Sequence, residues 1–262
     1  MEFQNSVFPY VLTCRNTSAR LPAFLVGWEH ALEDYRAKNP HAAGVPELTV
    51  VWGMNSNRFP RSPFWRLGPD KTEFPDCLSG NGLDRRGHTA CYWGHVQEWR
   101  QALGEHDDLF DVGSALFMED DCKLDVDFLS RAAEALAEVP DDWDLLYFGG
   151  ELGVHGRPMP PAYSANLYRV DNVNRTHCYA VRLSSLPKII LWFEENHDWG
   201  HNFKDPKTGQ SEAEVDYALG SLTESGYLNG YALKEWICGQ AAGFSWTQGR
   251  QEPARRWPTP LC

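Results

Sequence analysis

Three consecutive carboxylates, Glu119, Asp120 and Asp121, have the residue types and spacing that most clearly indicate chemistry. They follow a continuous apolar run, SALFM at 114–118, which is typical of a strand covered on both faces. Ligands of open α/β sheets bind beyond the carboxyl ends of such strands. In an extended segment Glu119 and Asp121 point to one side and Asp120 to the other. Because adjacent like charges repel, the triplet indicates a divalent cation that bridges carboxylate and phosphate oxygens. The alternative is a solvated turn whose acids cap the following helix.

A second acidic run, EAEVD at 212–216, begins a predicted helix. A reaction that activates an acceptor hydroxyl needs one positioned carboxylate as general base, and Asp216 or Glu214 would serve. The alternative is structural, because acids in a first helical turn interact favourably with the helix dipole.

Histidines provide further candidates. His95 lies on a predicted helix, and His177 lies at the start of a predicted strand. Each histidine would either reach a bound ligand or be a hydrogen-bonded imidazole in the core. His197 and His201 are four residues apart, but they lack the glutamate of an HExxH zinc motif, and Gly200 between them disfavours a regular helix.

The hydrophobic pattern predicts the elements that position these residues. Strands are expected at 7–13, 48–53, 114–118, 143–148, 166–170, 177–182 and 231–234, and helices at 19–38, 87–103, 125–139, 184–196 and 212–225. Asp125 is the expected N-cap of the third helix, and Pro187 is tolerated in the first turn of the fourth. Strands and helices alternate through about 150 residues. This order predicts an α/β fold with a mainly parallel central sheet and helices on both faces, in one domain over 1–262.

Composition limits the classes of function. The net charge of −12 disfavours extended binding to nucleic acid, although it does not exclude it. Seven cysteines, without CxxC pairs or zinc-finger spacing, indicate a reducing compartment and argue against a structural zinc. The first residues lack the pattern of a signal peptide, and no apolar run approaches the length of a membrane span. We therefore expect a cytoplasmic protein without a transmembrane segment.

Four segments, taken in order, resemble glycosyltransferase family 25, which contains lipooligosaccharide and procollagen galactosyltransferases. They are GHTACYWGHVQEW, ALFMEDDCKLDVDF, WDLLYFGG and RTHCYAVRLSSLPKI, and the similarity extends from about residue 11 to about residue 248. The resemblance implies a GT-A fold, a nucleotide-sugar donor such as a UDP-sugar, and a Mn²⁺ or Mg²⁺ requirement. The donor half would cover about 1–150 and the acceptor half about 151–262.

The resemblance also implies roles for individual residues. The acidic triplet falls on the family's DxD-like motif, so Asp121 is the expected metal ligand with Glu119 beside it. Glu119 or Asp120 would contact the ribose or ligate the metal through water. The family has an aspartate near Asp216, which favours this residue over Glu214 as the base. The remaining residues expected to contact the donor are Thr13, Arg15, Arg20, His95, Gln240 and Ser245.

These observations favour a metal-dependent inverting glycosyltransferase that moves a hexose to the hydroxyl of a glycan, protein or other acceptor. Two alternatives remain at this point. One is a noncatalytic protein that binds nucleotide-sugars on the same scaffold. The other is a metal-dependent phosphoesterase or nucleotidyltransferase that uses the same acids.

Overall fold

The structure is a computed structural model that describes residues 6–13, 19–41, 44–53, 86–152, 158–195, 215–245 and 250–256. Its centre is a seven-stranded sheet in the order β2-β1-β3-β7-β5-β8-β6. The strands are β1 (Val7–Thr13), β2 (Thr49–Trp52), β3 (Ser114–Glu119), β5 (Leu145–Tyr147), β6 (Leu167–Val170), β7 (Cys178–Arg182) and β8 (Gly230–Leu233). Five of them run in one direction, while β7 and β6 run against their neighbours. The predicted α/β fold with a mainly parallel sheet is confirmed.

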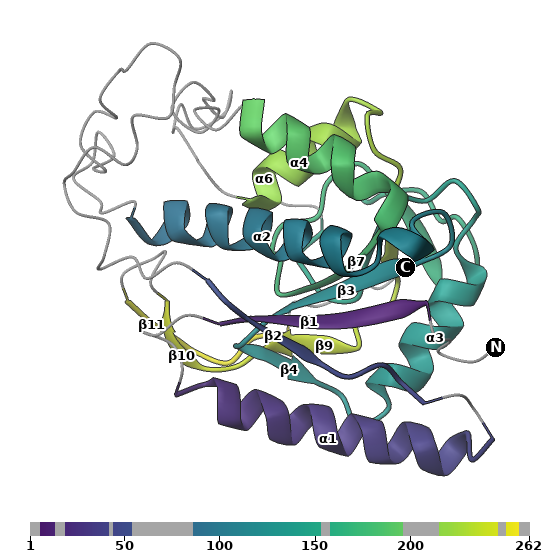
Figure 1. Ribbon diagram of the computed structural model, residues 1–262, viewed down its shortest axis with the longest axis vertical. Coiled ribbons are helices and arrows are strands. Elements are labelled where there is room, and N and C mark those ends of the chain that lie inside the picture. The colour runs from purple at the N-terminus through teal and green to yellow at the C-terminus, as the bar shows by residue number, and fades with distance from the viewer. Residues whose placement is uncertain are drawn as a thin grey trace.

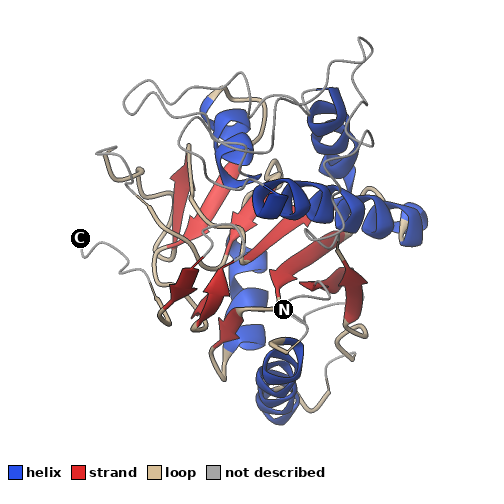
Figure 2. Ribbon diagram, turned by 90° about the vertical axis from the view of Figure 1, so that its left-hand side faces the viewer, coloured by secondary structure: helices blue, strands red, loops and turns tan. Residues whose placement is uncertain are grey.

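Helices cover both faces of this sheet (Figures 1 and 2). They are α1 (Leu21–Lys38), α2 (Arg86–Glu105), α3 (Phe128–Glu138), α4 (Leu186–Glu195) and α6 (Val215–Glu224), with short 3-10 helices η3 (Asp107–Leu109) and η5 (Leu183–Ser185). The helix α2 lies on one face with α4 and α6, whereas α1 and α3 pack together on the other (Figure 1). Each buries an apolar stripe, which in α1 consists of Phe24, Trp28, Ala31, Leu32 and Tyr35.

Two small ribbons were not expected from the sequence. One pairs β4 (Cys122–Leu124) with β9 (Cys238–Gln240), and the other pairs β10 (Gly243–Ser245) with β11 (Arg250–Glu252), both antiparallel. The first ribbon begins immediately after the acidic triplet, so β9 lies beside the predicted donor site.

The N-cap predicted for α3 is wrong. The helix is capped at Asp127, whose side chain makes no capping hydrogen bond. The carbonyl of Asp125 instead accepts a hydrogen bond from the amide of Phe128 at 3.1 Å, and its carboxylate pairs with Arg256. The side chain of Asp125 therefore forms a tertiary ion pair instead of capping the helix.

The order of the first strands creates a topological switch point. From β1 the chain passes through α1 to β2 on one side, and then through α2 to β3 on the other side of β1. The strand order therefore reverses at β1, and the carboxyl ends of β1 and β3 lie side by side at the edge where open α/β sheets bind their ligands.

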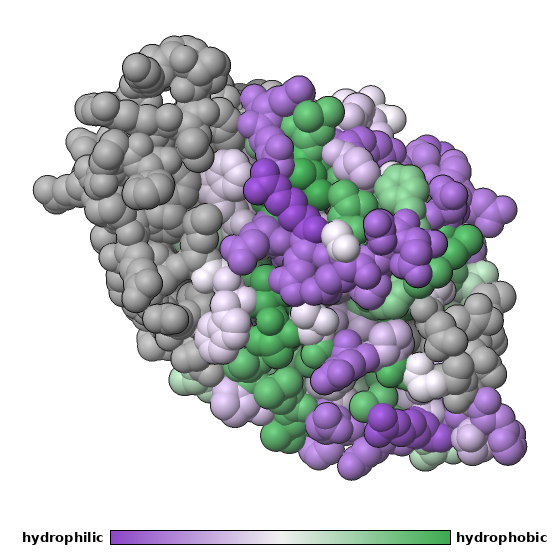
Figure 3. All heavy atoms as spheres, viewed as in Figure 1, coloured by the Kyte–Doolittle hydropathy of each residue, from purple (hydrophilic) through white to green (hydrophobic). Residues whose placement is uncertain are grey.

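The surface is mixed in character. Hydrophilic and hydrophobic residues alternate across the face seen in Figure 3. Within the ranges that the structure describes, no helix is both long enough and apolar enough to cross a membrane.

Candidate functional site

The acidic triplet lies in a turn whose backbone is held by three strands. β3 ends at Glu119, and its amide donates to the carbonyl of His177 at 3.0 Å, while the amide of Asp120 donates to the carbonyl of Leu12 at 3.0 Å. The carbonyl of Asp121 accepts a hydrogen bond from the amide of Ala241 at 2.7 Å. The carboxylates therefore project from a fixed backbone at the switch point.

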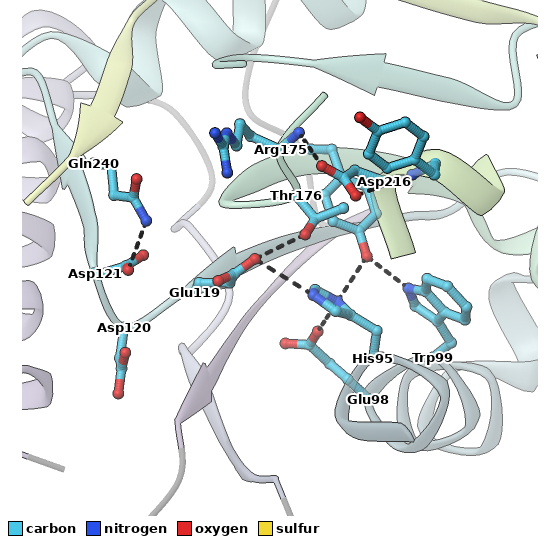
Figure 4. Close-up of polar contacts among 12 residues, drawn as sticks. His95, Glu98, Trp99, Glu119, Asp120, Asp121, Arg175, Thr176, Asp216 and Gln240 are labelled. Atoms are coloured by element: carbon cyan, nitrogen blue, oxygen red, sulfur yellow. Dashed lines mark hydrogen bonds and ion pairs between the residues drawn. The ribbon is translucent and has the colours of Figure 1, made fainter. Parts of the chain in front are cut away.

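Asp120 and Asp121 point in different directions from this turn (Figure 4). The hydroxyl of Thr13 donates to Asp120 at 2.7 Å, which joins the carboxyl ends of β1 and β3. Arg20, the residue before α1, places Nη1 3.0 Å from Asp121 Oδ2 and 3.7 Å from Asp120 Oδ1. The side-chain amide of Gln240, at the end of β9, donates to Asp121 Oδ2 at 3.0 Å (Figure 4). Three of the predicted donor residues thus converge on the two aspartates.

Glu119 is held separately, by a residue that precedes β7 and by one from α2. The hydroxyl of Thr176 donates to Glu119 Oε1 at 2.8 Å, and His95 Nε2 lies 3.6 Å from the same oxygen. Burial acts to raise the pKa of Glu119, but His95 and Thr176 outweigh it and hold the pKa at about 2. Burial and the charge of Glu119 raise the pKa of Asp121, although Arg20 and Gln240 offset part of this effect.

The imidazole of His95 belongs to a buried network behind Glu119. Nδ1 of His95 lies 3.0 Å from the hydroxyl of Tyr179, which accepts a hydrogen bond from the indole of Trp99 at 2.9 Å (Figure 4). Burial opposes a charge on His95, but Tyr179, Cys91, Glu119 and Glu98 outweigh it and raise the pKa of His95, so a protonated Nε2 faces Glu119. Because the side chain of His95 is fully buried, it reaches a ligand only by acting through Glu119. Its predicted direct contact with a donor remains a prediction.

Asp216 lies in the first turn of α6, where its carboxylate is oriented by backbone amides. Oδ2 accepts from the amide of Arg175 at 2.9 Å, and Oδ1 accepts from the amide of Tyr217 at 3.0 Å. Arg175 has φ 84°, and it is the only described residue other than glycine with a positive φ. This unfavourable backbone conformation directs the Arg175 amide at Asp216 while the next residue, Thr176, donates to Glu119. Two consecutive residues, Arg175 and Thr176, therefore connect Asp216 with Glu119.

Several predicted site residues cannot be placed. Arg15, Glu214, His197 and His201 lie outside the described residues, and for Ser245 only the backbone, in β10, is described. Their roles remain predictions. Thr176 was missed, although it lies within a quoted motif; its signal would have been a hydroxyl next to His177. Glu98, Trp99 and Tyr179 carry no local signal of a site.

One oxygen of the acidic turn is available to a hard divalent cation. Asp121 Oδ2 is occupied by Arg20 and Gln240, whereas Oδ1 is buried and has no hydrogen-bond partner among the described residues. Leaving a buried charged oxygen without a partner is costly, and carboxylate oxygens are the ligands that Mg²⁺ and Mn²⁺ prefer. Asp121 could therefore hold such a cation.

A group of residues that could hold a metal ion includes Glu119 itself. Cys91, His95 and Glu119 each offer one ligand atom, and these atoms lie within 4.8 Å of one another. Only Cys91 and Glu119 are partly exposed in this group, since His95 is buried beneath them.

Behind the acids lies a group of buried thiols. Sγ atoms of Cys122, Cys178 and Cys238 lie within 4.8 Å of one another. These thiols could hold a metal ion, and the expectation from cysteine spacing that the protein has no structural zinc stays a prediction. Burial acts to raise the pKa of Cys238, but the neighbouring thiols and His177 outweigh it, and the pKa lies well below its usual value.

Comparisons with known proteins add little. No family model matches the sequence, and no curated protein matches it. Among solved structures, the chain is similar to A197 from STIV, with 11% identity and a TM-score of 0.37 over 95% of this chain and 97% of that one. It is also similar to mouse xyloside xylosyltransferase 1 in its apo form, with 9% identity and a TM-score of 0.40 over 84% and 82% of the two chains. These TM-scores are too low to establish a shared activity, so the resemblance to family 25 remains a prediction.

Proposed function

We propose that this protein is an inverting glycosyltransferase that moves a hexose from a nucleotide-sugar, such as a UDP-sugar, to an acceptor hydroxyl, with Mn²⁺ or Mg²⁺ at Asp121. The observation that carries the proposal is the convergence of Thr13, Arg20, Gln240 and two aspartates at the switch point of the sheet. Asp121 Oδ1 is a buried acceptor without a hydrogen-bond partner among the described residues there.

The residues around the turn suit a diphosphate. Arg20 bridges Asp120 and Asp121, and its side chain retains 20% exposure, so the guanidinium can reach phosphate oxygens without leaving the site. Gln240 holds the Asp121 carboxylate in place, and Thr13 holds Asp120. When bound, the cation would neutralise the charge that develops on the leaving diphosphate. Glu119, which Thr176 holds by a hydrogen bond, is the second ligand of the proposal.

The acceptor half of the reaction is assigned to Asp216. The acceptor oxygen attacks the anomeric carbon as its proton passes to the Asp216 carboxylate. The bond between the anomeric carbon and the diphosphate oxygen breaks, and the nucleoside diphosphate leaves with that electron pair. Backbone amides from Arg175 and Tyr217 fix the direction of this carboxylate, which is the positioning that general-base catalysis requires. Glu214 remains the other candidate.

The experiment that tests the proposal is a donor screen by thermal shift and calorimetry, with and without Mn²⁺. A ligand that binds only the folded protein raises its melting temperature. We expect a nucleotide-sugar to bind in a Mn²⁺-dependent manner and Asp121→Asn to abolish that dependence. The products then identify the reaction: a nucleoside diphosphate supports glycosyl transfer, whereas pyrophosphate or inorganic phosphate would select a nucleotidyltransferase or phosphoesterase. Donor binding without turnover by any acceptor, water included, would select a noncatalytic binding protein.

A further inference from the structure

The buried thiols behind the acidic turn come from three separate strands. Cys122 begins β4, Cys178 begins β7 and Cys238 begins β9. Their exposed fractions are 4%, 0% and 1%, and all three are free cysteines. Register explains the convergence. Cys178 lies opposite Met118 at the end of β3, and Cys238 lies opposite Leu124 in the β4–β9 ribbon.

A fourth candidate donor atom, Nε2 of His177, lies beside the same glycine as Cys238 Sγ, outside the group of three mutually close sulfur atoms. His177, which precedes Cys178, is 2% exposed. A Cβ atom on Gly149 would be 2.5 Å from Cys238 Sγ and 2.7 Å from His177 Nε2, so the thiol and the imidazole nitrogen lie against the same face of this glycine. Only glycine fits at position 149 while both atoms keep these places.

We propose that Cys122, Cys178, Cys238 and His177 form a structural zinc site that is separate from the cation site at Asp121. Three thiolates and one imidazole are an established ligand set for structural Zn²⁺. Tetrahedral coordination with Zn–S distances near 2.3 Å places sulfur atoms about 3.8 Å apart, within the 4.8 Å that bounds the observed cluster. The ligands are buried and number four, as in closed structural sites, which leave no position for substrate.

The position of this site gives it a role in the fold. Cys122 follows Asp121 directly, and Cys238 lies two residues before Gln240, so both donors of the β4–β9 ribbon adjoin groups of the acidic turn. Cys178 and His177 belong to the region of the central sheet. A zinc ion would therefore fasten the ribbon to the sheet and hold Asp121 and Gln240 at their 3.0 Å contact.

The first test is the metal content of the protein purified under reducing conditions. We expect one zinc ion per chain by plasma mass spectrometry, and release of this zinc when a mercurial reagent blocks the thiols. Substitution with Co²⁺ is expected to give a thiolate-to-cobalt charge-transfer band and the visible bands of tetrahedral cobalt. Protein that contains no zinc and develops no thiolate–cobalt band would overturn the proposal. A disulfide between two of the three cysteines that persists in protein purified under reducing conditions would also overturn it.

Variants locate the metal. Cys178→Ser and Cys238→Ser are expected to lose zinc, and His177→Ala is expected to weaken Co²⁺ binding at least about tenfold. Cys91→Ser is the matched control, because Cys91 is a described thiol outside the cluster, and it should retain zinc. If Cys91→Ser alone lost the metal, the zinc would belong to the Cys91–His95–Glu119 group and the proposal would be wrong. Where a ligand variant does not fold, the cobalt spectrum of the wild-type protein still decides.

Asp121→Asn separates this inference from the proposed function. It is expected to lose Mn²⁺-dependent donor binding and to keep the thiolate–cobalt band unchanged. If the donor screen found no bound nucleotide-sugar, the zinc measurement would still test the proposal of a zinc site. If Asp121→Asn abolished the cobalt band, the two sites would be one, and the proposal of a separate zinc site would fail.

Discussion

Arg20 Nη1 lies 3.0 Å from Asp121 Oδ2, so a guanidinium already neutralises one oxygen of the carboxylate to which we assign the divalent cation. The other oxygen, Oδ1, has no such partner within the described part of the chain. The ion pair keeps the carboxylate oriented, but its positive charge also opposes a second cation nearby. Arg20 therefore opposes binding of the free metal ion but favours binding of the diphosphate.

Arg20→Ala is expected to increase the affinity for Mn²⁺ measured in the absence of donor, by about three- to tenfold, because a neighbouring positive charge is removed in a partly screened site. Electron paramagnetic resonance of free Mn²⁺ measures this directly. Arg20→Lys keeps the charge and should stay close to wild type. An Arg20→Ala protein that binds Mn²⁺ no more tightly would show that the guanidinium does not compete with the cation.

Thr176→Val is expected to lower the free energy of unfolding by about 1–3 kcal/mol at pH 7, because Glu119 loses the hydroxyl that donates to Oε1 and valine matches the shape of threonine. Urea denaturation measures the loss. Thr176→Ser retains the hydroxyl and should recover most of the stability. If serine and valine destabilised equally, packing rather than the hydrogen bond would explain the effect.

The long periodic elements of the fold could be predicted from the sequence. The strand at Val7–Thr13 was predicted with its observed bounds, and α1 differs from its prediction only at the first residues. The direction of β7 was not predictable, because a short apolar run such as CYAVR gives the same signal whether it pairs parallel or antiparallel. The three-residue strands β4 and β9 contain too few residues to show any alternation.

The acids of the site could be predicted because they are adjacent in the chain. The residues that bind them were harder to predict, because they are distant in the chain. Thr13 and Arg20 were expected from the resemblance, and their contacts with the aspartates depend on the switch in strand order. The thiol cluster left no local pattern, since Cys122, Cys178 and Cys238 are separated by more than fifty residues each. Only register between strands brings them together.

Glu98 provides a test of buried charge. Burial raises the pKa of Glu98 to about 7, although the neighbouring His95 ring opposes this rise. The other ionisable groups that face Glu98 are Glu119, Tyr10 and Tyr179. A carboxyl whose pKa is higher when folded binds its proton more tightly in the folded state. Its contribution to stability is therefore fully present below pH 4.5 and declines as the pH rises to about 7.

Glu98→Gln removes this dependence while it keeps the side-chain volume. Relative to wild type, the variant should gain up to about 3 kcal/mol in the free energy of unfolding between pH 4.5 and pH 7, and no more above that. Urea denaturation across this range is the measurement, with Glu105→Gln, at an exposed position on the same helix, as the control. A constant difference between variant and wild type from pH 5 to pH 8 would mean that Glu98 does not titrate in this window.

Asp216→Asn tests the acceptor half of the proposed reaction. Asparagine retains an oxygen for only one of the amides of Arg175 and Tyr217 and cannot take up the acceptor proton, so kcat should fall by about 10²–10⁴-fold while the KM for the nucleotide-sugar changes little. Release of the nucleoside diphosphate at saturating donor gives both constants. Glu214→Gln is the comparison: if it loses turnover and Asp216→Asn keeps it, the base is Glu214 and the amide contacts of Asp216 serve only to begin α6. Turnover that survives both substitutions would place the base outside this acidic run.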